Sequence, residues 1–253
     1  MDINKHNKYS KELVDMWGDY IDWEKRREGE NGFLLQQIRK ESEFILDAAL
    51  GDGADSIYLN QHFSKVYSNE VEEEFIKKAR ENSEKNKVNL HIREYDWKDF
   101  NIKFTRESFG TVLCLGNSFS SLLSKEDQQK TLDNFLYILQ KNGRLIIDER
   151  NYQYILDKKD DILEKDIFKY SGKYVYCGDK ITSKPVEITD NRVKMEYSNK
   201  KGSKKEYLDY YPFKKNELID LLKETGFQDI QQYSDYEKGY NPKADYYQYV
   251  CQK

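Results

Sequence analysis

Short apolar runs alternate with helix-like segments over more than half of the chain. The apolar runs lie at 44–50, 65–70, 90–97, 111–115 and 144–148. Between them, apolar residues recur three to four positions apart, as over residues 125–140, which is the period of a helix. Continuous runs such as Val112–Leu115 are typical of strands buried on both faces. This alternation predicts an α/β fold with a Rossmann-like, doubly wound, mainly parallel sheet, whose ligand crevice lies at the carboxyl ends of the strands.

The pattern changes after residue 165. Tyrosines then alternate with polar residues in short runs broken by glycine, proline and asparagine, which is typical of antiparallel strands. A helix-like segment at 214–225 and alternating runs in the tail follow. We expect three parts, namely an N-terminal helical lid (1–40), a Rossmann-like domain (41–165 and 212–253) and a small antiparallel β insertion over the crevice (166–211).

The first predicted strand ends in a glycine-bearing turn with the pattern D-x-x-x-G-x-G, formed by Asp47, Gly51 and Gly53. Glycines let the backbone approach a ligand and adopt positive φ, and the helix that follows points its amide end to the same place. The dinucleotide fingerprint requires a third glycine where this chain has Ser56. The turn therefore suits S-adenosylmethionine better than a dinucleotide, and a nicotinamide-dependent oxidoreductase is a weaker alternative.

Acidic residues follow the next two predicted strands. Glu70 lies close to the roughly 20-residue interval expected for a carboxylate that accepts both ribose hydroxyls. Asp96 and Trp97 end the third strand and combine an acceptor for an exocyclic amine with a face for stacking. Together these residues predict a site for an adenosine group.

Composition narrows the possible functions. The chain has 253 residues and a net charge of −4, with 42 basic and 46 acidic residues interleaved, so no basic field favours nucleic acid. No apolar stretch approaches the roughly 20 residues that span a bilayer, and residues 1–8 lack a signal-like run. Three cysteines and three histidines, without metal-ligand spacing, predict neither a disulfide framework nor a metal site. We expect a cytoplasmic protein with a small-molecule substrate; the sequence leaves monomer or homo-oligomer open.

Two motifs resemble those of glycine N-methyltransferase and the glycine/sarcosine N-methyltransferases. They are C-L-G-N-S-F at 114–119 and D-x-R-N-Y-x-x-I-L at 148–156. The resemblance extends into residues 16–27, 174–178 and 208–212 and so covers nearly the whole chain. It implies the class I methyltransferase fold, S-adenosylmethionine as cofactor with S-adenosylhomocysteine as product, and glycine or sarcosine as substrate.

The resemblance also implies roles for individual residues. Arg150 would bind the substrate carboxylate with its two-pronged guanidinium, and Asn117 would position the amino acid. Tyr176 and Tyr197 would line the amine's side of the pocket, and Tyr9, Tyr20 and Arg27 would lie in the lid near the methyl donor. With the turn, strand and lid residues together, the expected cofactor-binding set is Tyr20, Arg27, Asp47, Ala49, Gly51, Gly53, Asp55, Glu70, Asp96, Trp97 and Leu115.

The chain departs from the family pattern at four positions. Glu149 stands where animal glycine N-methyltransferases have histidine, and Gly110 replaces an aspartate before the fourth strand. Leu50 and Asp52 stand where the family usually has cysteine and threonine. If strand alternation holds, Glu149 points away from Arg150; if Glu149 turns inward, it neutralises Arg150 and the substrate need not be an α-amino acid.

The sequence predicts an N-methyltransferase that uses S-adenosylmethionine to methylate glycine, sarcosine or both, by in-line attack of a neutral amine. Two alternatives stay open. One is a methyltransferase for a small amine that lacks a carboxylate; the other is a non-catalytic protein that binds S-adenosylmethionine and regulates a partner.

Overall fold

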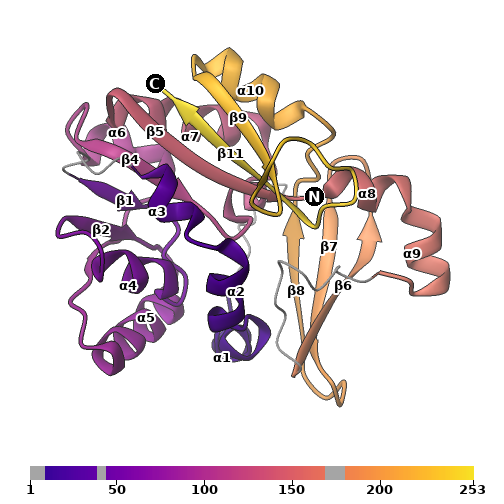
Figure 1. Cartoon of the computed structure of the whole chain (residues 1–253). Helices are drawn as coiled ribbons and strands as arrows, with labels where there is room; N and C mark the ends of the chain where they lie inside the picture. The colour runs from indigo at the N-terminus through magenta and orange to yellow at the C-terminus, as the bar shows by residue number, and fades with distance from the viewer. Residues whose placement is uncertain (1–8, 39–43, 169–179) are drawn as a thin grey trace.

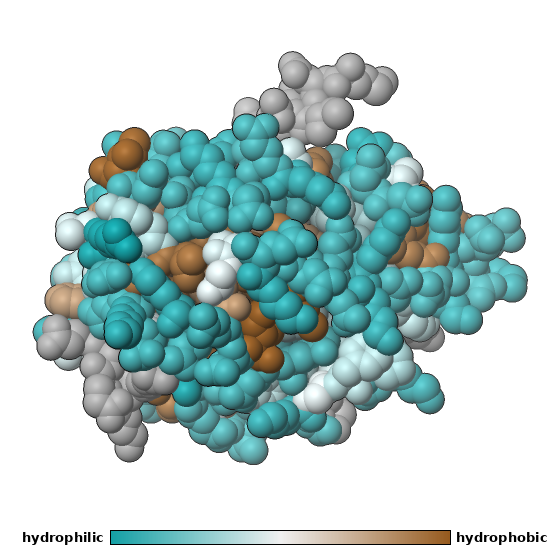
Figure 2. All heavy atoms as spheres, turned by 90° about the horizontal axis from the view of Figure 1, so that it is seen from above, coloured by the Kyte–Doolittle hydropathy of each residue, from teal (hydrophilic) through white to brown (hydrophobic). Residues whose placement is uncertain are grey.

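The computed structural model describes residues 9–38, 44–168 and 180–253 (Figure 1). A mixed eight-stranded sheet forms its centre and a separate three-stranded antiparallel sheet lies to one side. Within the described residues, no helix combines the length and apolar character needed to cross a bilayer. The surface in Figure 2 is mostly hydrophilic, with hydrophobic residues visible in patches between hydrophilic ones.

The large sheet has the order β10-β9-β11-β5-β4-β1-β2-β3. Its strands are β1 (Ile45–Asp47), β2 (Val66–Asn69), β3 (His91–Arg93), β4 (Phe109–Cys114), β5 (Leu139–Arg150), β9 (Gln228–Ser234), β10 (Glu237–Lys238) and β11 (Tyr246–Gln252). Strands β1 to β5 pair in parallel, and β11 pairs antiparallel with both β5 and β9. The strand order reverses between β1 and β4, which is where open α/β sheets bind their ligands.

Helices cover both faces of this sheet. The helices of the described residues are α1 (Lys11–Tyr20), α2 (Trp23–Glu30), α3 (Phe33–Gln37), α4 (Ala54–Asn60), α5 (Glu73–Asn86), α6 (Phe100–Lys103), α7 (Lys125–Ile138), α8 (Tyr152–Asp157), α9 (Lys159–Lys165) and α10 (Glu217–Thr225), with the 3₁₀ turns η1 (Trp97–Asp99) and η2 (Ser118–Ser121). Alternate residues of one strand enter different cores: Leu46 packs with residues of α6, α7 and α10, whereas Ile45 packs with residues of α3 and α4. This alternation explains the continuous apolar runs in the sequence.

The small sheet consists of β6 (Ile181–Ile188), β7 (Val193–Asn199) and β8 (Lys205–Tyr210), in that order. Its buried side chains share one hydrophobic cluster with residues of α1, α8 and α9. In Figure 1, α1 and α2 lie between this sheet and the helices α4 and α5. The N-terminal segment therefore joins the two sheets over the carboxyl ends of the parallel strands.

The predicted fold class is confirmed: a mainly parallel Rossmann-like sheet is accompanied by a separate antiparallel sheet. Several predicted elements differ in extent; the strand expected at 144–148, for example, runs from Leu139 to Arg150 as β5. The third strand ends at Arg93, and Asp96 instead caps the 3₁₀ turn that begins at Trp97, with its carboxylate accepting from the Lys98 N–H at 2.9 Å. The helix expected from residue 214 begins at Glu217.

Candidate active site

Two connected cavities lie at the carboxyl ends of β1, β2, β4 and β5. The larger cavity is bounded by the turn after β1 and the residues after β2 and β3, and the smaller cavity lies over the ends of β5 and β11. Five residues line both cavities and mark their junction: Trp17, Ile21, Arg26, Gly116 and Tyr210.

The glycine turn forms one wall of the larger cavity. Gly51 (φ +54°) lines the cavity and donates its N–H to the Glu70 carboxylate at 2.9 Å. Gly53 (φ +92°) does not line it, because it packs against α5, where an added Cβ would lie 3.1 Å from the Ala79 Cβ. Gly51 thus supplies the open approach to a ligand, and Gly53 supplies the close packing of α4 on α5.

Asp47 supports this turn from behind and does not line the cavity. Its carboxylate accepts from the Ser56 hydroxyl at 2.7 Å and from the Ala49 N–H at 3.3 Å. Burial raises the pKa of Asp47 to about 6. Ser56 is fully buried in this contact, so it serves the fold of the turn, which lacks the third glycine of a dinucleotide site.

Glu70 lies at the end of β2 and faces the larger cavity. Besides Gly51, its carboxylate accepts from the N–H groups of Val71 at 2.9 Å and Glu72 at 3.1 Å. Burial raises the pKa of Glu70 to about 7 even with these donors. A half-buried, backbone-anchored carboxylate of this kind is suited to accept hydroxyl hydrogens of a ribose.

Trp97 and Asp96 form the far wall of the larger cavity, together with Ala49 and Leu115. The Trp97 indole N–H donates to the Ala48 carbonyl at 2.7 Å, which fixes the ring plane. The cavity therefore offers a flat aromatic surface beside a carboxylate, as an adenine base requires.

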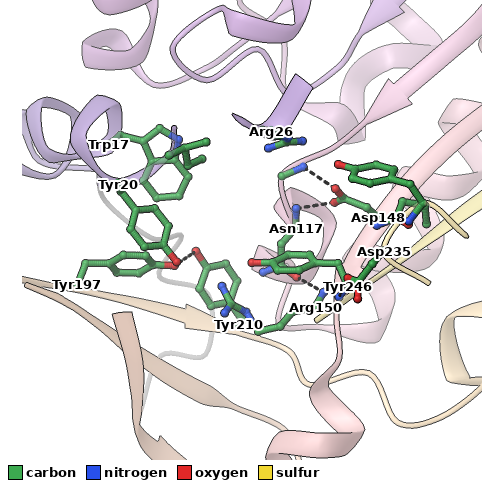
Figure 3. A pocket seen from close by; sticks show the side chains of 14 residues that line it. Trp17, Tyr20, Arg26, Asn117, Asp148, Arg150, Tyr197, Tyr210, Asp235 and Tyr246 are labelled. Atoms are coloured by element: carbon green, nitrogen blue, oxygen red, sulfur yellow. Dashed lines mark hydrogen bonds between the residues drawn. The ribbon is translucent and has the colours of Figure 1, made fainter. Parts of the chain in front are cut away.

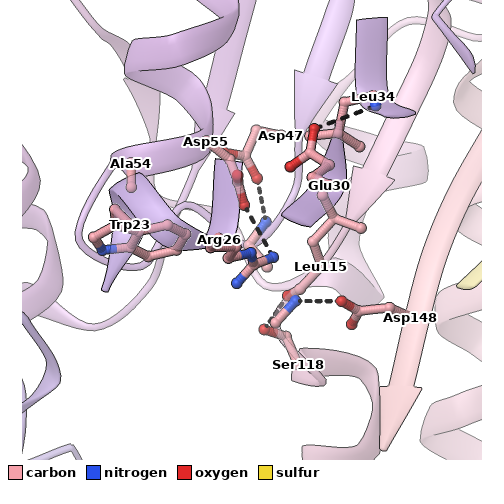
Figure 4. A network of polar contacts seen from close by, with 12 residues as sticks. Trp23, Arg26, Glu30, Leu34, Asp47, Ala54, Asp55, Leu115, Ser118 and Asp148 are labelled. Carbon is pink, nitrogen blue, oxygen red and sulfur yellow. Dashed lines mark hydrogen bonds and ion pairs between the residues drawn. The ribbon is translucent and has the colours of Figure 1, made fainter. Parts of the chain in front are cut away.

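The two adjacent arginines of α2 have different surroundings, and Figure 4 shows Arg26 near Asp55. Arg27 does not line either cavity; it forms ion pairs with Glu30 and Asp55 and lies over the Tyr58 ring. Arg26 lines both cavities, with its guanidinium 3.8 Å from Asp55. Consecutive helix residues point about 100° apart, so the residue facing the site is Arg26, where we had expected Arg27.

The floor of the smaller cavity comes from β5 and β11. Asp148 pairs with Gln248 and Arg150 pairs with Tyr246, so all four side chains share one face of the sheet. Arg150 is only 3% exposed, and its guanidinium carbon lies 5.2 Å from the centre of the Tyr246 ring. This face presents a fixed positive charge to the cavity.

Asn117 connects β4 to β5 beside Arg150 (Figure 3). Its backbone, at φ +62°, donates an N–H to Asp148 at 2.6 Å. Its amide group donates to the Tyr152 hydroxyl at 2.8 Å and accepts from the Arg150 N–H at 3.0 Å. Asn117 therefore holds the end of β5, and with it the Arg150 backbone, in place.

Aromatic side chains from α1 and the small sheet form the opposite wall (Figure 3). Tyr20 lines the smaller cavity and not the larger one, and its hydroxyl is 2.7 Å from that of Ser183. The Tyr197 and Tyr210 hydroxyls lie 3.0 Å apart. The fourth expected acceptor residue, Tyr176, lies outside the described residues.

Comparison with known proteins identifies the family. The model of a methyltransferase domain matches residues 45–143. A glycine/sarcosine N-methyltransferase from Aphanothece halophytica is 34% identical over 98% of this chain and 90% of its own length, and one from Halorhodospira halochloris is 34% identical over 95% and 87%. The chain belongs to the glycine/sarcosine N-methyltransferase family. A solved S-adenosylmethionine-dependent methyltransferase from Clostridium acetobutylicum shares the fold, with a TM-score of 0.70 at 18% identity and 92% coverage of both chains.

Most predicted site residues of this methyltransferase line the two cavities. The larger cavity has seven of the expected cofactor residues, namely Ala49, Gly51, Asp55, Glu70, Asp96, Trp97 and Leu115. The smaller cavity has Asn117, Arg150, Tyr197 and Tyr20. Asp47, Gly53 and Arg27 do not line either cavity and instead stabilise the segments that do.

Several lining residues were not predicted from the sequence, namely Trp17, Arg26, Asp148, Tyr210, Asp235, Tyr236, Tyr246 and Gln248. Two of them had a usable signal. Asp148 is two positions before Arg150 in a strand, and Arg26 is three positions after Trp23 in a helix, so each shares a face with a cavity residue. Asp235 and Tyr236 lie in the turn between β9 and β10, and Tyr246 and Gln248 lie in β11. Their positions at the cavity depend on strand pairing, which the sequence pattern does not specify.

Glu149 faces away from the acceptor side of this methyltransferase. Its carboxylate accepts from the Tyr249 hydroxyl at 2.6 Å on the other face of β5, as strand alternation predicts. Burial raises the pKa of Glu149 to about 8, so at neutral pH the group is mostly uncharged. Glu149 therefore leaves the charge of Arg150 intact.

Among residues 9–38, 44–168 and 180–253, no cluster of three or more potential ligands is arranged for a metal ion.

Proposed function

We propose that this methyltransferase transfers the methyl group of S-adenosylmethionine to the amines of glycine and sarcosine. The observation that carries the proposal is Arg150, buried at the floor of a small cavity that adjoins a larger, adenosine-suited one and shares five lining residues with it. The names of the Aphanothece and Halorhodospira relatives support the same substrates.

The residues of the larger cavity fit the methyl donor. Gly51 would give the backbone approach, Glu70 would accept from the ribose hydroxyls, and Trp97 would stack on the adenine. Arg26, which lines both cavities, would bind the donor's carboxylate with its guanidinium. When bound, S-adenosylmethionine supplies an electrophilic methyl group on a positively charged sulfur.

The smaller cavity orients the acceptor. Arg150 binds the substrate carboxylate through its fork of N–H groups, and Asn117 maintains the Arg150 backbone. The aromatic wall with Tyr197 then bounds the amine and directs its lone pair to the junction. Holding both reactants in line contributes roughly 7 to 11 kcal/mol to catalysis in favourable cases.

The amine reacts in its neutral form, and its proton passes to solvent. Burial raises the pKa of Tyr152 and Tyr210 above the ordinary tyrosine value, so these hydroxyls stay protonated and do not serve as bases. Neither His62 nor His91 lines either cavity, and His6 lies outside the described residues. The protein therefore contributes position and electrostatics to the reaction.

The N-terminal segment and the insertion cover the site as a lid in this proposal. The Ser10 hydroxyl donates to Glu206 at 2.8 Å and Lys180 pairs with Asp19 at 2.6 Å, so α1 is tied to both edges of the small sheet. The limits 1–40, 41–165 with 212–253, and 166–211 belong to this proposal. The cytoplasmic location also remains a prediction.

The test is a panel of acceptors assayed for S-adenosylhomocysteine release. Glycine and sarcosine should be turned over, and amines without a carboxylate should not. Turnover of those amines alone would favour the small-amine alternative. Donor binding without turnover of any amine would favour a regulatory protein. Mass analysis of the products from glycine counts the methyl groups added.

A further inference from the structure

The turn between β9 and β10 has a backbone conformation that is rare for its residues. Ser234 pairs with Glu237, which leaves Asp235 and Tyr236 as the two central residues. Both have positive φ, +49° and +68°. Two-residue hairpins with this geometry usually use asparagine and glycine, because side chains are disfavoured there. A tyrosine in this position signals a function that needs the ring.

Hydrogen bonds to the β11 segment hold the turn in this conformation. The Asp235 carboxylate accepts from the N–H groups of Asp245 at 3.1 Å and Tyr246 at 2.9 Å. The Tyr236 N–H donates to the side-chain oxygen of Gln248 at 2.8 Å. The buried partners Asp235 and Gln248 thus compensate for the strain in the backbone.

The turn forms a third wall of the smaller cavity, beside the floor and the aromatic wall. Asp235 and Tyr236 line this cavity and not the larger one. The Tyr236 ring packs against Phe33, with centroids 5.3 Å apart, and interacts electrostatically with Arg26. The Tyr236 ring therefore lies between α3 and the smaller cavity.

The three walls leave a defined place for each part of an α-amino acid. The floor with Arg150 takes the carboxylate, and the amine must face the junction with the larger cavity. The aromatic wall bounds the amine, so the remaining wall, with Tyr236, faces the α-carbon and anything attached to it.

We propose that Tyr236 limits the size of the substituent on the acceptor's α-carbon, so that glycine and its N-methyl derivatives are selected over amino acids with side chains. This inference rests on the proposed function, because it takes the carboxylate to lie at Arg150. A pocket that rejects one extra methyl group by size discriminates roughly 10- to 200-fold.

The test compares Tyr236→Ala and Tyr236→Gly with the wild-type enzyme. Both variants remove the ring, and only glycine accepts the positive φ without strain. We expect kcat/KM for glycine relative to L-alanine to fall at least tenfold in both variants. We also expect the glycine variant to have a higher Tm than the alanine variant. Tyr240→Ala, which removes an exposed ring a few residues further on, should leave the ratio unchanged.

The outcomes separate this inference from the proposed function. Wild-type turnover of glycine tests the proposed function alone. If the wild type turns over glycine, the inference is overturned when kcat/KM for glycine relative to L-alanine is unchanged in both Tyr236 variants and donor binding is also unchanged. The ring would then have only a packing role against Phe33. Formation of N-methylalanine by the variants, detected by mass, would support it directly.

Discussion

Glu149 shows how one buried residue affects stability without contacting substrate. Its raised pKa means that the folded chain retains a proton that the unfolded chain releases above the ordinary value of 4.5. Between pH 4.5 and about 8, this group therefore lowers the free energy of unfolding as pH rises, by at most about 1.4 kcal/mol per pH unit.

Glu149→Gln should remove this pH-dependent loss. The amide keeps the hydrogen bond to Tyr249 and cannot ionise, so the variant should be more stable than the wild type at pH 8 and nearly equal at pH 5. Urea unfolding at several pH values measures the difference. Glu164→Gln, at an exposed position, is the control and should not change the profile. A constant difference between wild type and Glu149→Gln at all pH values would contradict the argument.

Glu70 predicts a second pH effect, on donor binding. Burial raises its pKa to about 7 in the free protein, and only the ionised carboxylate accepts from both ribose hydroxyls. Affinity for S-adenosylmethionine, titrated without acceptor, should increase severalfold from pH 6 to pH 8. Glu70→Gln should bind more weakly with little pH dependence, whereas the exposed Glu73→Gln should behave like the wild type. A pH-independent wild-type affinity would count against the ribose role.

At the scale of single residues, the sequence predicted the site residues that follow strands better than the site residues that lie on helices. Arg150 and Glu70 line the cavities because strand ends converge at one edge of a parallel sheet. Arg26 and Arg27 are neighbours on a short helix, and the choice between them depends on how α2 packs against α4. That packing, through Arg27 with Asp55, is a tertiary contact.

Helix α1 contributes two aromatic side chains to the smaller cavity, which is the proposed acceptor site. It carries Trp17 and Tyr20, and Ser10 caps its first turn by accepting the Leu13 N–H at 3.0 Å. Ser10 also donates to Glu206 on β8. The cap therefore fixes both the start of the helix and its contact with the small sheet.

Ser10→Ala should lower the free energy of unfolding by about 0.5 to 2 kcal/mol, the usual effect of a lost N-cap. It should also raise KM for glycine severalfold, because α1 loses its tie to the small sheet. Ser124→Ala removes the equivalent cap of α7 at a residue that lines neither cavity, and should cost similar stability without changing KM for glycine. Equal KM effects of the two variants, measured with S-adenosylmethionine in excess, would refute the special role of α1.

The elements themselves were predictable where local pattern and tertiary environment agree. The buried strands β1, β4 and β5 and the helices α5 and α7 follow their apolar periodicity. The pattern did not predict that β3 ends at Arg93, because the Asp96 cap that redirects the chain is a side-chain to backbone contact.

At the scale of the whole molecule, the two sheets and the N-terminal helices meet over the two adjoining cavities. The parallel sheet supplies the residues proposed to bind the donor, β5 and β11 supply the proposed carboxylate site, and α1 with the small sheet supplies the aromatic wall. The mainly parallel sheet was predicted from the sequence pattern, but its strand order and the pairing of β11 beside β5, which brings Tyr246 to Arg150, required the structure.

The most direct test of the assignment of the larger cavity to the donor and the smaller cavity to the acceptor uses two variants, Arg150→Ala and Glu70→Ala. For each variant, KM for glycine and Kd for S-adenosylmethionine are measured. Arg150→Ala should raise KM at least 100-fold, equivalent to about 2.7 kcal/mol, with Kd nearly unchanged. Glu70→Ala should weaken donor binding with a much smaller effect on glycine. Equal loss of donor affinity in both variants would contradict the assignment of the two cavities to donor and acceptor.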